Sequence, residues 1–451
     1  MPIQLSCTLN PYLPVTHQRH LVYVLVEVEA SGDNAVGEPT PINLGLVVDA
    51  SRSMAIPILT EAQFDALAAQ GMAKKKQVDG VSVWQFDIPR GLKVEAPSNL
   101  DFTKEALRIV AGHLRPADRF SLVAFAEEAS TMVAHATGAE KDALLKAVER
   151  LDQVALGDET FVARGMEMGY RQTLPGVSPD RVSRMVVLTD GYTQDEHACY
   201  EWTRQAKQEG IVVSTMGLGL DFNEELLISL ADVSGGHAYF LDDPQEIPSA
   251  FRQELFSAQS VTWQDLSLAL TLPADVTLRR AHRVRPVIAS VETPGDTIAL
   301  GDLEGGPHVP SPAALLELVV PPRPAGAYRL AQIALRARAA GSPSAEEVAT
   351  EDVVARYAEK PSLAQQTNAE LMAAIQKVSA FKLHTQAMAA SQRGDLAGAT
   401  RRLRVAGERL IEMGEADLGH TMLTEAELME KEGQMSAEGT KKLRYGTRKL
   451  S

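Results

Sequence analysis

The sequence predicts an α/β protein in which a three-layer, doubly wound, mostly parallel sheet is joined to a flanking β-sandwich and a C-terminal helical region. Between residues 41 and 260, short apolar segments alternate with amphipathic helical segments. Between residues 261 and 360, strand-like segments separated by Pro- and Gly-rich turns follow one another, and residues 361–451 are rich in Ala and Leu at helical spacing. The first pattern is typical of a parallel sheet covered on both faces, and the second of an antiparallel sandwich.

Residues 1–40 are expected to belong to the sandwich rather than to the domain that directly follows them. They contain the β-branched run LVYVLVEV at positions 21–28, followed by a loop rich in Gly, Asn and Pro. A short N-terminal sheet of this kind would leave exposed edges, so its strands need partners elsewhere. The strands expected to supply them are residues 266–272, 276–284, 297–300, 314–320, 328–337 and 348–357.

Residues 41–260 show the alternation expected of the parallel sheet. The expected strands are residues 42–48, 120–125, 131–134, 184–188, 211–216 and 238–241. The expected helices are residues 103–113, 141–151, 162–173, 197–208, 224–233 and 245–257. Right-handed crossovers place the carboxyl ends of the parallel strands along one edge, which is where ligands bind in such sheets.

Composition and charge exclude several classes of partner. The chain has 59 Asp and Glu against 44 Lys and Arg, a formal net charge of −15, so most of its surface repels nucleic acid. Residues 1–20 do not read as a signal peptide, and no stretch approaches the roughly 20 apolar residues of a membrane helix. Cys7 and Cys199 are too few for a disulfide framework; two reduced thiols are expected, with one long-range disulfide as the alternative. A cytoplasmic protein with no membrane partner is therefore predicted.

Polar residues that suit a metal ion follow two of the expected strands. Asp49, Ser51 and Ser53 stand in the segment DASRSM directly after strand 42–48, and Asp190 stands in LTDG directly after strand 184–188. Alone, each segment is most often a helix cap or a turn. At neighbouring strand ends, two carboxylates and two hydroxyls form an oxygen-only ligand set that suits Mg²⁺ or Mn²⁺.

At these residues the sequence resembles the von Willebrand factor A family, whose metal-ion-dependent adhesion site combines Asp-x-Ser-x-Ser, a Thr and an Asp from three successive loops. Thr160 in GDETF is the match for the Thr, although the family usually has Gly-Gly-Thr and this chain has Asp158 and Glu159 before it. The resemblance covers about residues 41–256 and includes RPADRF at 115–120, GLG at 217–219 and SGG at 234–236. It implies a bacterial intracellular member that binds Mg²⁺ or Mn²⁺ and captures an Asp or Glu of a protein partner. The ligands so implied are Asp49, Ser51, Ser53, Thr160 and Asp190.

Enzyme motifs are poorly matched. Ser51 stands where a haloacid dehalogenase-type phosphatase needs a second carboxylate, and Gly217-Leu218-Gly219 lacks the third glycine of a dinucleotide site. No side chain near the motif is placed as an evident general base. The sequence therefore predicts a non-catalytic interaction module or adaptor. The alternatives are a non-catalytic subunit of an AAA-type ATPase or other enzyme complex, and a metal-dependent hydrolase.

An insertion at residues 55–100 separates the first metal loop from the helix that follows it. Thr60 and Gln63 form a capping-box pattern that opens a helix through residue 69, and VDGV at 78–81 predicts a hairpin turn before a strand at 82–88. The insertion is expected to act as a lid or recognition surface, with Trp84 and Phe86 on one face of the strand; the alternative is that it packs to one side. Candidate partner-contacting residues are Asp158, Glu159, Trp84 and Phe86.

The C-terminal region is expected to contain helices at residues 364–390, 396–413 and 417–432, followed by a basic tail. The tail residues are Lys441, Lys442, Arg444, Arg448 and Lys449. The pattern favours a solvated tail. The alternatives are a segment that docks on an acidic partner or on the acidic domain of the same chain.

Overall fold

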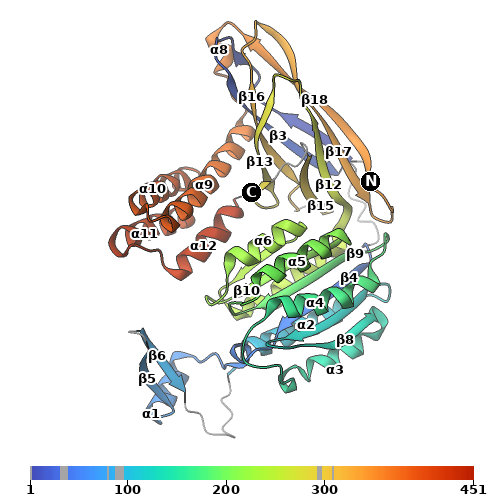
Figure 1. The fold of residues 1–451 in the computed structure, drawn as a ribbon, viewed down its shortest axis with the longest axis vertical. Coiled ribbons are helices and arrows are strands. Elements are labelled where there is room, and N and C mark those ends of the chain that lie inside the picture. The colour runs from blue at the N-terminus through green and yellow to red at the C-terminus, as the bar shows by residue number, and fades with distance from the viewer. Residues whose placement is uncertain are drawn as a thin grey trace.

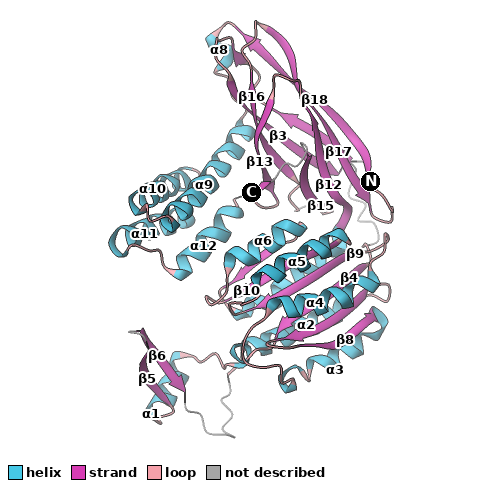
Figure 2. Cartoon of the chain, in the orientation of Figure 1, coloured by secondary structure: helices cyan, strands magenta, loops and turns pink. Residues whose placement is uncertain are grey.

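The computed structural model describes residues 3–30, 39–78, 81–86, 96–291, 297–306 and 309–450, with backbone only for residues 61, 73–78 and 81–86 (Figure 1). The predicted fold class is confirmed: an α/β domain, a β-sandwich and a helical region follow one another (Figure 2). No helix in the described ranges has the length and apolar character needed to span a membrane. Cys7 and Cys199 are both free thiols.

The α/β domain is built on a sheet with the strand order β11-β10-β9-β4-β7-β8. The bounds are β4 Ile42–Asp49, β7 Arg119–Phe125, β8 Ala129–Thr137, β9 Val182–Thr189, β10 Ile211–Leu218 and β11 Ala238–Leu241. Neighbouring strands are parallel, except that the edge strand β8 runs antiparallel to β7. The strand expected at 131–134 is longer in the structure, because a short connection after β7 lets β8 pair antiparallel with β7 along its whole length.

Helices cover both faces of this sheet. One face packs on α2 (Asn99–His113), α3 (Lys141–Val148) and α7 (Ile247–Ser260). The other face packs on α4 (Val162–Thr173), α5 (Glu196–Gln208) and α6 (Glu224–Ser234). Because both faces are covered, every residue of β4 and β9 is buried, and most of these residues are apolar.

The sandwich combines strands from both sides of the α/β domain. One sheet has the order β1-β3-β16-β13-β14, and the other has the order β15-β12-β17-β18-β2. The N-terminal strands are β1 (Ile3–Thr8), β2 (Leu13–Pro14) and β3 (His20–Ala30). The later strands are β12 Val261–Thr271, β13 Thr277–Arg285, β14 Ala289–Val291, β15 Thr297–Glu304, β16 Ala313–Val320, β17 Gly326–Ala339 and β18 Glu346–Ala358. β3 pairs antiparallel with β16, with Leu25 opposite Leu315, so the chain returns after the α/β domain to complete a sheet that it began at its N-terminus.

The helical region consists of α8 (Pro361–Ala364), α9 (Ala369–Gln392), α10 (Leu396–Glu412), α11 (Ala416–Glu432) and α12 (Ala437–Arg448). Figure 1 shows α9 descending from the sandwich and α12 returning toward α6. The core of this region includes residues of β3, β13 and β16, so the helices and one outer face of the sandwich form a continuous apolar cluster.

The prediction of a solvated basic tail is wrong. Residues 437–448 form α12, and Lys441 is 2% exposed. Its ammonium group donates to the carbonyl of Phe222 at 2.7 Å and lies 2.9 Å from Glu224. Arg448 donates to Asp232 on α6 at 2.7 and 2.8 Å. The basic segment docks on the acidic α/β domain of its own chain, because burying a lysine or arginine requires a matched acceptor.

The insertion contains α1 (Glu61–Ala69) and the hairpin β5 (Ala73–Val78) and β6 (Val81–Phe86). The capping box is present, with the amide of Gln63 donating to the hydroxyl of Thr60. The amide of Ile58 donates to the carbonyl of Pro97 at 2.8 Å and closes a narrow neck, whereas Figure 1 shows α1, β5 and β6 apart from the α/β domain. The neck, and not the hairpin, lies beside the predicted metal loops. The side chains of Trp84 and Phe86 lie outside the described residues.

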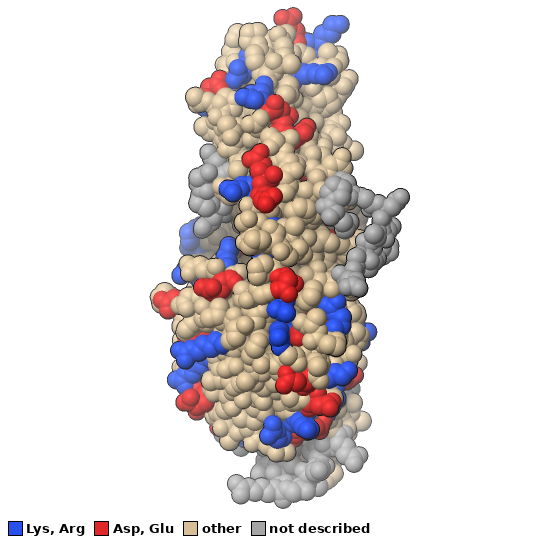
Figure 3. Space-filling model, turned by 90° about the vertical axis from the view of Figure 1, so that its right-hand side faces the viewer, with Lys and Arg blue, Asp and Glu red and all other residues tan. Residues whose placement is uncertain are grey.

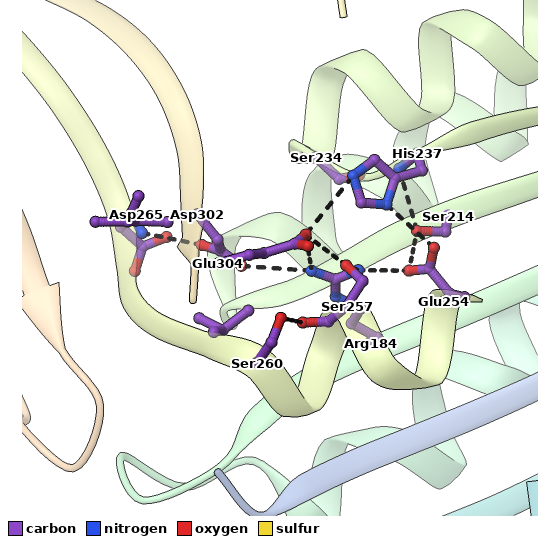
Figure 4. Close-up of polar contacts among 12 residues, drawn as sticks. Arg184, Ser214, Ser234, His237, Glu254, Ser257, Ser260, Asp265, Asp302 and Glu304 are labelled. Carbon is purple, nitrogen blue, oxygen red and sulfur yellow. Dashed lines mark hydrogen bonds and ion pairs between the residues drawn. The ribbon is translucent and has the colours of Figure 1, made fainter. Parts of the chain in front are cut away.

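A buried arginine joins the α/β sheet to the sandwich (Figure 4). Arg184 of β9 is 2% exposed, and its guanidinium donates to Glu254 at 2.6 Å and to Ser257 at 2.8 Å, both on α7. It also lies 3.6 Å from the carboxylate of Glu304 on β15. Burial alone would raise the pKa of Glu254, but Arg184 and His237 outweigh it and hold that pKa well below its usual range. The carboxylate of Glu254 is therefore ionised in the folded protein at neutral pH.

Replacing Glu254 with Gln should destabilise the fold strongly, because Arg184 then loses its closest counter-charge in a dry site. We expect a loss of about 3 kcal/mol or more in the free energy of unfolding, measured by urea denaturation. The control Asp352→Asn removes an exposed pair with Arg329, 3.4 Å apart, and should cost less than about 1 kcal/mol. Equal effects of the two substitutions would contradict this account of Arg184.

Candidate metal site

The first loop of the site fixes a buried carboxylate at the end of β4. Asp49 is fully buried, and one of its oxygens accepts the amide of Ser51 at 2.8 Å. Its other oxygen accepts the hydroxyl of Thr189 at 2.7 Å. Val48 of β4 lies opposite Leu188 of β9, so the parallel register brings Asp49 level with the end of β9. The carboxylate is therefore held on both sides before any ligand binds.

The serine hydroxyls connect this loop to the third one. The hydroxyl oxygens of Ser51 and Ser53 are 3.0 Å apart, and Ser53 donates to Asp190 at 2.7 Å. Asn99, the first residue of α2, donates its side-chain amide to the other oxygen of Asp190 at 3.1 Å. Ser53 is exposed while Asp49 and Asp190 are buried, so this cluster opens to solvent on one side only.

Thr160 approaches the same edge from the second loop, just before α4. A Cβ placed on Gly191 would lie 2.9 Å from the hydroxyl oxygen of Thr160, so only glycine allows this close approach after Asp190. The second and third loops are tied together, because the amide of Val162 donates to the hydroxyl of Thr193 at 2.9 Å. All the residues that the sequence analysis proposed as metal ligands therefore lie together at the carboxyl edge of β4 and β9.

The loop that departs from the family pattern is still tightly packed. Gly157 has a positive φ of 97°, and a Cβ there would lie 2.6 Å from the Cβ of Glu127. Asp158 and Glu159, proposed as partner contacts, are exposed beside Thr160, and Gln194 donates to Glu159 at 3.1 Å. They form an acidic rim and do not point inward with the ligands.

Sequence reasoning missed residues that support the site. Thr189 is the last residue of β9 and orients Asp49, and Asn99 orients Asp190. Thr193 and Asp195 bond to the amides of Val162 and Ala163 at the start of α4. Thr189 could have been found from its place beside Asp190, but Asn99 becomes a neighbour of Asp190 only because the neck of the insertion closes.

The described residues do not balance the negative charges at this edge. Burial, and then the charge of Asp190, raises the pKa of Asp49 to about 6. The pKa of Asp190 is also raised, mainly by burial. Within the described residues no cluster of three or more His, Cys, Asp or Glu could hold a metal, so hydroxyls must complete this ligand set. Two buried carboxylates with adjacent hydroxyls fit a small, hard divalent cation, which would relieve their mutual repulsion.

Comparison with known proteins agrees with the fold around this site. Residues 95–253 match the family model of the von Willebrand factor type A domain. The chain contains a VWA domain. The match includes Thr160 and Asp190, and Asp49 with its loop precedes the matched range. Because β4 pairs with β7 and with β9, Asp49 nevertheless belongs to the same sheet. Residues 369–451 match a second model, the Sll0103-like C-terminal alpha-helical domain.

Curated relatives share part of the chain. An uncharacterized Synechocystis protein, sll0103, is 28% identical over 213 residues, which is 45% of this chain and 50% of that protein. The Escherichia coli protein YfbK is 23% identical over 217 residues, which is 47% of this chain and 37% of that protein. The matches thus span half or less of the length of these relatives.

Solved structures match the whole chain. A von Willebrand factor type A protein from Catenulispora acidiphila has a TM-score of 0.73 at 18% identity, covering 99% of this chain and 96% of that one. The ArnB paralog VWA2 from Sulfolobus acidocaldarius has a TM-score of 0.56 at 16% identity, covering 100% and 99%. At these identities the likeness shows the fold alone, including the combination of VWA domain, sandwich and helices.

Mg²⁺ should stabilise the folded protein, because it binds the assembled loops and not the unfolded chain. At a concentration 100-fold above its Kd, an ion bound at one site adds about 2.7 kcal/mol, which thermal unfolding with and without Mg²⁺ detects. Asp190→Ala should abolish the shift and leave the metal-free melting temperature nearly unchanged, since the lost hydrogen bonds are offset by removal of a like charge. Asp142→Ala, at an exposed position on α3, is the control. If millimolar Mg²⁺ and Mn²⁺ do not change the melting temperature of the unmutated protein, the metal-site assignment is wrong.

The stabilisation by Mg²⁺ should shrink on acidification. In the metal-free fold the pKa of Asp49 is raised to about 6, above its unfolded value, so protonation favours the metal-free fold as pH falls toward 4. A proton and a metal ion compete for this carboxylate, so the Mg²⁺-induced rise in melting temperature should be larger at pH 7.5 than at pH 5. An equal rise at both values would show that Asp49 does not contribute to binding.

Proposed function

We propose that the VWA domain holds Mg²⁺ or Mn²⁺ through Asp49, Ser51, Ser53, Thr160 and Asp190 and uses the ion to bind a protein partner. The partner supplies an Asp or Glu side chain to the metal. The observation that carries this proposal is the pair of buried carboxylates, with raised pKa values and adjoining hydroxyls, at the exposed edge of the sheet. VWA domains generally mediate protein–protein interaction, which supports this role.

The ligand set favours capture of an anionic oxygen over activation of water. The hydroxyls of Ser51, Ser53 and Thr160 are neutral, so the ion keeps an attraction for a further carboxylate. The described side chains that touch Asp49 and Asp190 outside this set are Thr189 and Asn99, and neither is a general base at neutral pH. A metal-dependent hydrolase is therefore the weaker alternative.

The rim of the site suggests what surrounds the partner's carboxylate. Tyr192, two residues after Asp190, is 61% exposed, and Ile56, three residues after Ser53, is 53% exposed. Asp158 and Glu159 add negative charge beside Thr160. A partner loop whose acidic residue is flanked by apolar and basic residues would match this rim, since a strongly acidic loop would be repelled.

The proposal places the protein in the cytoplasm of a bacterium, as an adaptor or assembly factor. Its two free thiols are compatible with a reducing compartment. Nucleic acid is not the expected partner: on the face that Figure 3 shows, acidic and basic side chains are interspersed without a broad basic stripe. The alternative is that the protein is a non-catalytic subunit of an AAA-type ATPase or other enzyme complex. It would use the same metal site, and only the identity of the partner would differ.

Partner capture should require the metal. Proteins that bind the immobilised full chain in Mg²⁺ should elute when a chelator removes the ion, and Asp190→Ala should retain none of them, while Asp142→Ala retains them all. Adding ATP distinguishes the two kinds of partner, because an ATPase complex should change its retention with nucleotide and an adaptor target should not. Retention that is equal in Mg²⁺ and chelator would contradict the proposal.

The insertion should alter partner choice without altering metal binding. Pro57 and Ser98 form a bridge at the neck, so replacing residues 58–97 with a short Gly/Ser linker rejoins a chain that already meets there. We expect the deletion variant to keep the Mg²⁺-induced rise in melting temperature and to change partner affinity or selectivity. Unchanged affinity and selectivity for every captured partner would show that the insertion is only scaffold.

A further inference from the structure

A second polar site lies far from the metal loops, where α9 crosses the outer face of the sandwich. On β13, Ala281 points into the sandwich core, whereas Val284 belongs to the apolar cluster shared with α9. His282 lies opposite Leu315, a member of the same outer cluster, so it also faces α9. Arg280 lies two residues before His282 on the same strand, so its side chain is on the same face, beyond the apolar contact with α9.

A cavity of about 400 Å³ opens at this point. Its floor is β13, with Arg279, Arg280 and His282, and its edge is Ser290 of β14. The wall on the other side is α9, which contributes Lys382 among others. This size suits a small organic molecule and is too small for a folded partner.

Most of the positive charge in the cavity has no counter-charge among the residues that the structure describes. Lys382 binds Glu317 at 2.6 Å, so those two charges cancel. Arg279 and Arg280 are exposed, and neither has an ion pair or side-chain hydrogen bond with the part of the chain that the structure describes. Two adjacent unpaired arginines in a chain of net charge −15 form a local positive potential that attracts anions.

A buried group in the cavity also lacks a partner. His282 is 3% exposed, and neither of its ring nitrogens has a hydrogen-bond partner among the described residues. The nearest carboxylate oxygen, on Glu317, is 3.8 Å from Nε2, which is too long for a hydrogen bond. Burial, and then the charge of Lys382, lowers the pKa of His282 to about 4, so the ring is neutral and carries one N–H donor. Buried donors without acceptors are rare in folded proteins and need an explanation.

We propose that this cavity binds a small organic or inorganic anion with at least two negative charges, of the phosphate or polycarboxylate class. Arg279 and Arg280 supply the counter-charge, and the N–H group of His282 donates to an anionic oxygen deeper in the cavity. Ser290 lies at the opening and contributes a hydroxyl. The site joins the sandwich to the helical region, so an occupant would contact both. It is independent of the metal loops and of their proposed partner.

The test is titration calorimetry of the full-length protein with inorganic pyrophosphate and, separately, with citrate, in buffer freed of metal by a chelating resin. Sodium chloride at matched ionic strength is the blank. We expect saturable binding of at least one anion, and the arm that binds more tightly distinguishes phosphate from carboxylate recognition. The Asp190→Ala variant should bind equally well, which separates this site from the metal loops. Failure of both anions to bind below about 10 mM overturns the proposal, because two arginines acting together bind such ions more tightly.

Substitutions locate the binding. Arg280→Gln should weaken it at least tenfold, while Arg336→Gln, at an exposed position of β17, should leave it unchanged. His282→Leu should weaken binding without lowering the melting temperature, since it removes a buried polar group that has no partner. Equal affinities of the Arg280→Gln and Arg336→Gln proteins would show that the anion binds elsewhere and would overturn the assignment.

Discussion

The burial of Arg184 is the constraint on which the arrangement of the VWA domain and the sandwich depends. A guanidinium in a dry interior is tolerated only when counter-charges are held against it. Glu254 on α7 and Glu304 in the sandwich supply these counter-charges, and Ser257 on α7 accepts a further hydrogen bond. The position of β9 relative to both is thereby specified. Since β9 ends at Thr189, directly before Asp190, the strand that carries this anchor also positions the third loop of the metal site.

The buried charges at Arg184 and at the metal loops are arranged in opposite ways. At Arg184 the protein matches a buried positive charge, and the pKa of Glu254 falls below its usual range. At Asp49 and Asp190 it buries two negative charges together, and both pKa values rise. The second arrangement weakens the metal-free fold and makes the loops receptive to a cation. Stability provided elsewhere in the domain permits this local imbalance, which is common at functional sites.

A second charged junction connects all three parts of the chain. Asp232, on α6 of the VWA domain, accepts hydrogen bonds from Arg448 of α12 and from Arg283 of the sandwich strand β13, at 2.7 and 2.8 Å. The amide of Ile288 donates to the carbonyl of Arg448 at 2.7 Å and adds a backbone contact. With Lys441 buried against Phe222, these contacts keep the helical region on the VWA domain. The chain therefore has docked units and not domains on free linkers, which agrees with solved structures that match it from end to end.

Local sequence patterns determined the elements and the candidate ligands, and the tertiary structure decided how they support one another. The apolar runs of β4 and β9 predict buried parallel strands, and strands of that kind bring their carboxyl ends to one edge, so Asp49, Ser51, Ser53 and Asp190 could be grouped before the fold was known. Asn99 and Glu254 could not be found in this way, and docking of the basic segment on its own chain was an alternative that the sequence could not favour. Each depends on a contact between side chains distant in sequence, and periodicity carries no information about which distant element a polar side chain will meet. The basic residues at 441–449 show the difference: as a sequence they are a charge cluster typical of a solvated tail, and only the acidic groups of α6 make them part of the folded core.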